Sequence, residues 1–156
     1  MRPSLAALRI ERRRLSVAIF IDHHLEHAES HHLPSDYPKA LRSASQFVHK
    51  VRRTFRAEYA ALDKYPSDHP TQRSTLIQEL VMQLRRADVA VYEVEIADLL
   101  AAFGNPPLRY RTQVRQAVAS IWPILASGDN HPSCLDAAAL GLYVQVEKLL
   151  ASKELT

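Results

Sequence analysis

The sequence predicts an α/β domain in which helices cover both faces of a mixed five-stranded sheet. Three strand-like segments open the chain, at residues 5–10, 14–21 and 25–33, and the short turns between them predict an antiparallel meander. Two later strand-like segments, at residues 59–63 and 89–94, alternate with helical patterns. Such alternation is typical of parallel strands joined by crossover helices, so the later part of the sheet is expected to be parallel.

The strand segments differ in the environment that their residues predict. Residues 14–21 are rich in Val, Ile and Phe, as a buried strand should be. Residues 25–33 alternate only weakly and are polar, which predicts a solvent-facing or edge strand that ends at Pro34 and Pro38. The short apolar run at residues 59–63 predicts a buried strand that closes with an acid.

Helical periodicity separates and follows the later strands. Residues 38–55 place apolar side chains at three- and four-residue spacing, which predicts the buried face of an amphipathic helix. The same spacing predicts helices at residues 71–86, 109–125 and 133–150, and residues 95–103 are expected to form a short helix or turn. The buried face of the last helix is expected to contain Leu135, Ala139, Leu142, Val146 and Leu149.

Composition places the chain among ordinary globular proteins. Of its 156 residues, 47% are hydrophobic and 24% are charged, and we expect a single domain over residues 1–156. The formal net charge is +3 and the isoelectric point is about 9.2. This mildly basic balance permits a polyanionic partner without requiring one.

Other features of the composition exclude some functional classes. The three glycines do not cluster, which argues against phosphate-cradling loops and classical dinucleotide-binding sites. The single cysteine, Cys134, excludes an internal disulfide and suits a reducing compartment, and we expect it in the core. No apolar run reaches the ~20 residues of a membrane helix, and the first residues do not resemble a signal peptide. We therefore expect a cytoplasmic protein without a membrane partner.

Three segments resemble, in their order along the chain, the motifs of a known nuclease family. Residues 8–19 resemble its first hairpin, residues 59–63 its second acidic strand, and residues 135–142 its final acidic helix. In this respect nearly the whole chain resembles the ribonuclease-H-like fold and, within it, the RuvC-type Holliday-junction resolvases. The resemblance implies branched DNA as the substrate and Mg²⁺ or Mn²⁺ as the cofactor of an active enzyme.

The acidic positions of that family are only partly retained in this chain. Asp63 falls on the family's second acid and Asp136 on its last acid, whereas Ser133 falls where the family often has another aspartate. Arg9 falls on the first aspartate, and Glu11 lies two residues further along the same strand. The family's glycines beside the first acid are absent too. These differences lie at the positions of the active site. They therefore put the cleavage activity in doubt, but they do not affect the fold prediction.

Arg9 is the departure with the largest chemical consequence. Phosphodiester hydrolysis in this fold uses two divalent ions about 3.5–4 Å apart, held mainly by carboxylates. An arginine cannot lose its proton, and its repulsion of a cation amounts to several kcal/mol on the ~4 kcal/mol scale of a unit charge pair. Arg9 is therefore expected to pair with Asp63 or Asp136 in place of the metals. Alternatively, a one-residue bulge would turn Glu11 inward as the missing ligand.

The two retained aspartates also have purely structural explanations. An acid that closes an apolar strand needs a partner, and a neighbouring arginine would satisfy Asp63 without any metal. Ser133 and Asp136 match a capping box, in which Ser133 caps the last helix and Asp136 reaches back to its start. Both explanations stay open at the level of sequence.

Basic and histidine-rich segments supply further candidates. Six arginines are candidate nucleic-acid contacts, although charged helix faces are common: Arg12, Arg13, Arg14, Arg109, Arg111 and Arg115. Tyr110 and Trp122 are candidate base-stacking residues, with core packing favoured for Trp122. The histidines between His23 and His32 suggest a zinc site or, as the interleaved acids favour, a solvated edge strand.

Three functional hypotheses follow. The favoured one is a RuvC-like nucleic-acid-binding protein, a degenerate structure-selective endonuclease that has lost or weakened its cleavage and needs no metal. The first alternative is an active Mg-dependent resolvase-like endonuclease that cuts branched DNA with Glu11, Asp63 and Asp136 as catalytic metal ligands. The second is a non-catalytic protein-interaction module, for which a homodimer is one arrangement. A metal-binding role of the histidine cluster is a weaker addition.

Overall fold

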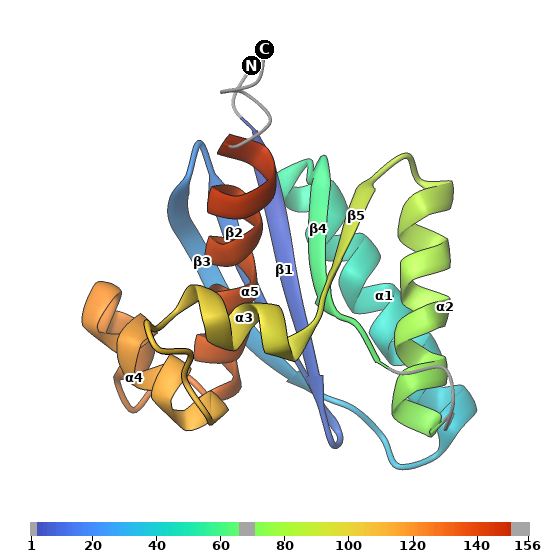
Figure 1. The fold of residues 1–156 in the computed structure, drawn as a ribbon. Helices are drawn as coiled ribbons and strands as arrows, with labels where there is room; N and C mark the ends of the chain where they lie inside the picture. Colours follow the sequence, from blue (N-terminus) through green and yellow to red (C-terminus); the bar gives the residue numbers. More distant parts are fainter. Residues whose placement is uncertain (1–2, 66–70, 151–156) are drawn as a thin grey trace.

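A five-stranded sheet organises the computed structural model, which describes residues 3–65 and 71–150 (Figure 1). Its strands lie in the order β3-β2-β1-β4-β5. Strand β1 pairs antiparallel with β2 and parallel with β4, while β2–β3 is antiparallel and β4–β5 is parallel. This arrangement confirms the predicted mixed sheet. The strands are β1 (Ser4–Glu11), β2 (Arg14–Ile21), β3 (His24–His32), β4 (Tyr59–Asp63) and β5 (Ala90–Val94).

Helices cover both faces of the sheet, as the sequence predicts. Figure 1 shows α1 and α2 on one side and α3, α4 and α5 on the other. Two separate apolar cores result, one between the sheet and α1 and α2, and one beneath α5. The helices are α1 (Tyr37–Phe55), α2 (Gln72–Arg86), α3 (Ile96–Ala102), α4 (Arg111–Ile121) and α5 (Ser133–Val144).

The alternation of side chains along β1 decides which residues face which core. Leu8 and Ile10 pack into the core beneath α1 and α2, whereas Leu5 and Ala7 pack into the core beneath α5. Because strand side chains alternate, Arg9 lies on the α5 face with Ala7. Arg9, the first of the candidate site residues, therefore lies on the α5 side of the sheet, near the carboxyl end of β1.

The β1–β2 hairpin is regular to its tip. Its register runs without a shift from Ser4 opposite Ile21 to Glu11 opposite Arg14. Glu11 thus shares the face of Arg9 by simple alternation, and the bulge considered for this position is not present. The only register irregularity of β2 lies on its other side, at Ile19 and Phe20 against β3. Strand β3 forms one edge of the sheet, as predicted from its polarity.

Two helix predictions need correction. The helix expected over residues 109–125 ends at Ile121, and a separate 3₁₀ turn, Pro123–Ala126, follows. Pro123 has no backbone N–H and disfavours helix at the residue before it, which accounts for the break. In the last helix, Val146 is exposed instead of buried. The backbone there winds as a π-helix, Gln145–Leu150, and the wider turn rotates the expected face.

Some sequence predictions fall partly outside the described residues. The single domain expected over residues 1–156 is one of these, because residues 1–2, 66–70 and 151–156 are not described. No helix in the described part of the chain combines the length and hydropathy that a membrane span requires.

Candidate functional site

The site begins where two parallel strands end. The β1–β4 register places Ala7 opposite Ala61, so two residues further along Arg9 lies beside Asp63, the last residue of β4. Both side chains are buried. Strand β4 is apolar up to this point, and the acid at its end therefore enters a largely closed environment.

Arg9 connects the two aspartates that the family resemblance singles out. Its Nη1 donates a 2.5 Å hydrogen bond to Oδ2 of Asp63 and a 2.8 Å hydrogen bond to the Tyr65 hydroxyl. Its Nε lies 3.8 Å from Oδ2 of Asp136 and has no hydrogen-bond partner in the described structure. Arg9 was expected to pair with Asp63 or Asp136, and it lies within ion-pair distance of both, with the tighter contact to Asp63.

Helix α4 adds two further arginines. Arg111 Nη2 lies 2.5 Å from Oδ1 of Asp63. Arg115 lies four residues later on the same helix face. It donates two hydrogen bonds to Asp136, of 2.9 Å from Nε and 2.6 Å from Nη2. The same Nη2 reaches Glu11 at 3.2 Å. Arg111 and Arg115, expected to contact phosphates, are thus already engaged by carboxylates.

We call these six residues the ion cluster: Arg9, Glu11, Asp63, Arg111, Arg115 and Asp136. Three guanidinium groups face three carboxylates, so the formal charges of the cluster cancel. Burial works against the charge of Arg9, but the Asp63 carboxylate and its other neighbours outweigh this, and the pKa of Arg9 is raised above its ordinary value. The hydrogen bonds to Asp136 raise the pKa of Arg115 as well. Both arginines remain charged at any physiological pH.

The cluster does not fit a pair of divalent cations. Each of its three carboxylates has an arginine within ion-pair distance, and the Arg9 guanidinium contacts both buried aspartates. A cation there would meet permanent positive charge and would have to displace charge-assisted hydrogen bonds. Among the described residues, no group of three or more His, Cys, Asp or Glu side chains is arranged to hold a metal ion.

The beginning of α5 differs from the expected capping box. The helix starts at Ser133, and its N-cap residue, Pro132, provides no side-chain hydrogen bond. The Ser133 hydroxyl instead hydrogen-bonds Ser16 in β2 and lies 2.7 Å from Nδ1 of His131. Asp136 turns toward Arg115 instead of toward the helix end. The capping interpretation was wrong because buried partners from other elements compete for both side chains.

The remaining candidates fall in several environments. Arg12, Arg13 and Arg109 are exposed, and Tyr110 is 65% exposed just before α4. Trp122 packs edge-on against Phe20 in the core beneath α5, in agreement with the favoured core role.

The histidines of β3 are divided among separate partners. His27 stacks on Phe55 and contacts Glu29, while His31 stacks on Phe47 and contacts Ser43. These contacts tie the strand to α1 and do not bring the rings together around one point. They suit the edge-strand interpretation better than a zinc site.

Sequence reasoning missed two residues of the site. Tyr65 follows the second acid by two positions and hydrogen-bonds Arg9, and a polar aromatic residue just beyond a strand was the available signal. His131 lies in the loop before α5, a position that no periodic pattern marks.

Comparison with known proteins gives structural matches but no sequence matches. No protein-family model matches the chain, and no curated protein matches it. Thermus thermophilus RuvC superposes with a TM-score of 0.71 at 15% identity, covering 92% of this chain and 96% of that one. The fowlpox virus Holliday junction resolvase gives a TM-score of 0.63 at 14% identity, covering 92% and 99%. The fold is RuvC-type and ribonuclease-H-like.

A third structure of this fold type agrees with that assignment. The yeast mitochondrial Holliday junction resolvase has a TM-score of 0.62 at 7% identity and covers 87% of this chain and 76% of that one. Within the RuvC-type fold, the carboxyl ends of β1 and β4 and the start of α5 meet, and this is where the ion cluster lies. The expected fold is confirmed.

Proposed function

We propose that this protein binds branched nucleic acid, with DNA favoured, through a RuvC-type fold whose metal-dependent cleavage is lost or weakened. Two structures support the substrate class. Both T. thermophilus RuvC and the fowlpox virus resolvase have been solved in complex with Holliday junction substrate or DNA. We infer the same substrate class for this chain, without the nuclease reaction.

One observation carries the proposal. The Arg9 guanidinium contacts both Asp63 and Asp136, where a cutting enzyme of this fold would need cations between carboxylates. A guanidinium can neutralise the two acids and hold them in place, but it cannot lower the pKa of a water molecule as a metal does. The ion cluster therefore favours a protein that keeps the fold of a resolvase but does not hydrolyse the phosphodiester bond.

The direct test uses a fluorescently labelled four-way DNA junction with a matched linear duplex. Binding is measured by anisotropy in EDTA, and cleavage is measured on denaturing gels with Mg²⁺ or Mn²⁺. We expect junction binding that is tighter than duplex binding, that weakens with salt and that persists in EDTA, without metal-dependent products.

The alternatives give different results in the same experiment. Products that need Mg²⁺ and that disappear in both Asp63→Asn and Glu11→Gln would establish the active endonuclease instead. Absence of binding to junction and duplex alike would reject a nucleic-acid role and favour the interaction module. For that module, analytical ultracentrifugation would then decide whether the partner is a second copy of the chain.

A further inference from the structure

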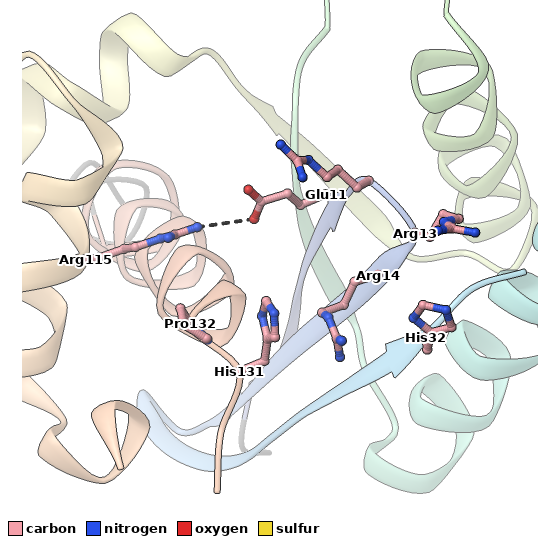
Figure 2. Close-up of a pocket in the computed structure, with 8 residues that line it drawn as sticks. Glu11, Arg13, Arg14, His32, Arg115, His131 and Pro132 are labelled. Atoms are coloured by element: carbon pink, nitrogen blue, oxygen red, sulfur yellow. Dashed lines mark hydrogen bonds and ion pairs between the residues drawn. The ribbon is translucent and has the colours of Figure 1, made fainter. Parts of the chain in front are cut away.

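An open pocket of about 380 Å³ lies beside the ion cluster, at the tip of the β1–β2 hairpin. Figure 2 shows its labelled side chains arriving from four places: the hairpin, the end of β3, α4, and the segment that leads into α5. Glu11 and Arg115 belong to both the pocket and the ion cluster. The remaining lining includes Arg12, Arg13 and Arg14 with His131. We call it the basic pocket.

The basic pocket carries a net positive charge, whereas the formal charges of the ion cluster cancel. Its lining contains four arginines and one carboxylate, Glu11, which leaves three excess positive charges when histidines are neutral. That excess equals the formal net charge of the entire chain, +3. The acids and bases elsewhere therefore cancel in number, and the lining of the basic pocket carries as large a positive excess as the whole chain.

The hairpin arginines are available to a ligand. Within the described part of the chain, Arg12 and Arg13 have no carboxylate partner, and Arg14 makes only a 3.5 Å hydrogen bond to Ser30. Arg115, in contrast, already binds Asp136 and Glu11. An incoming anion would thus meet three guanidinium groups that need not leave a partner first.

His131 lies on the opposite wall of the basic pocket. Partial burial and the charge of Arg14 lower the pKa of His131 below its ordinary value of 6.5. Its Nδ1 hydrogen-bonds the buried Ser133, so the ring is held in place by a neighbour that cannot move away easily. The imidazole of His131 and the hairpin arginines thus line the basic pocket from opposite walls.

We propose that the basic pocket binds one phosphate group of a nucleic-acid strand, held by Arg13 and Arg14 with His131 on the opposite wall. Guanidinium groups match phosphate oxygens in geometry, and a strand phosphate requires an open pocket of this kind. The inference rests on the proposed function and adds where the strand lies. A strand held there would run past Glu11 and Arg115 and across the ion cluster.

A solvated hairpin tip is the ordinary alternative for three consecutive arginines. Like charges repel, and such a tip would be expected to spread its side chains into solvent. Here the hairpin arginines line a hollow that is closed on the far side by His131 and Pro132. The charge is therefore concave and shared between elements, which is the arrangement that concentrates an anion.

The test compares pocket variants with a matched control of equal charge. Arg13→Gln/Arg14→Gln removes two pocket arginines, and Arg53→Gln/Arg56→Gln removes two exposed arginines at the far end of α1 and beyond it. Junction binding is measured at several salt concentrations. For the pocket pair we expect roughly tenfold weaker binding and a salt slope reduced by about one, because the two arginines together neutralise one phosphate. The control should keep the wild-type slope.

A second measurement separates this inference from the proposed function. Inorganic phosphate is titrated into ¹⁵N-labelled wild-type protein at constant ionic strength, and amide shifts near Arg13 and His131 are followed. Saturable shifts that the pocket pair abolishes, together with junction binding, support the proposal. The same shifts without junction binding would make free phosphate the ligand and overturn the strand assignment. If the junction binds but both variant pairs behave alike, the pocket is overturned and the proposed function stands. If neither probe binds, both fail.

Discussion

Nη1 of Arg9 lies 2.5 Å from Oδ2 of Asp63, and both side chains are less than a tenth exposed. The pair sits at the carboxyl ends of two neighbouring parallel strands. A charge buried alone costs several kcal/mol, so each partner makes the other tolerable in this place. At this strand end Arg9 is thus a buried cation that depends on acidic partners.

Removing the acid of this pair should destabilise the fold. Asp63→Asn leaves the Arg9 charge buried beside a neutral amide, and we expect a loss of about 3–5 kcal/mol in the free energy of unfolding. Arg9→Met should cost less, because Arg111 and Arg115 still compensate the two aspartates. Urea unfolding followed by circular dichroism measures both.

A double variant provides the control for this prediction. Arg9→Met/Asp63→Leu removes both charges together, so its loss should be smaller than the sum of the two single losses. Strict additivity of the three free energies would contradict a direct Arg9–Asp63 interaction.

An acid placed at the end of the first strand should create metal binding. Arg9→Asp places four carboxylates with only Arg111 and Arg115, and the excess negative charge should attract Mn²⁺. At a free metal concentration of a hundred times its Kd, stabilisation amounts to about 2.7 kcal/mol. We expect Mn²⁺ to raise the Tm of this variant, and EDTA to reverse the effect.

Arg9→Asn is the matched control for that experiment, since it removes the guanidinium without adding a carboxylate. Its Tm and that of the wild type should respond little to Mn²⁺. An equally large, EDTA-reversible rise in the wild type would show that the native cluster admits a cation despite Arg9.

The strand-end part of the site was predictable from the sequence, for a physical reason. The resemblance placed Arg9 among the family's acidic positions, and its pairing with Asp63 or Asp136 was expected from that. The structure supplies the reason: β1 and β4 are parallel neighbours, so residues near their carboxyl ends lie at the same edge of the sheet. The face of Glu11 could not be decided from the sequence, where a bulge stayed open, and the regular hairpin register decides it.

The other half of the site depends on packing that local sequence does not encode. Arg111 and Arg115 reach the acids only because α4 packs beside α5, and the segment between β5 and α4 carries no pattern that sets this position. Likewise, the capping box at Ser133 was a sound local pattern that long-range partners overrode. Ser16 lies more than a hundred positions away in the chain and competes for its hydroxyl.

Removing the one acid of the basic pocket should strengthen nucleic-acid binding. Glu11 is about one-third exposed, and it faces the pocket while engaging Arg115 at 3.2 Å. Glu11→Gln raises the positive excess of the lining and releases part of Arg115, so we expect several-fold tighter junction binding at low salt. Glu26→Gln, an exposed acid on β3 outside this pocket, is the matched control. Weaker binding in Glu11→Gln would favour a direct ligand role of its carboxylate.

The position of Asp136 should depend on a glycine in the same helix. A Cβ added at Gly141 would lie 2.8 Å from Cδ2 of Phe20, a core residue that Trp122 holds edge-on. Because the ring cannot move away freely, Gly141→Ala should push α5 from the sheet and cost about 1–3 kcal/mol, as overpacked cores do. A shift of α5 would also move Asp136 relative to Arg115, so weaker junction binding should accompany the lower stability.

Gly128→Ala is the control, since an added Cβ there meets nothing within 4 Å. Thermal unfolding and junction-binding anisotropy are measured for both variants. A lower Tm and weaker binding in Gly141→Ala alone would show that close helix–sheet contact at Gly141 keeps the ion cluster assembled. Equal stability of the two variants would refute this role of Gly141.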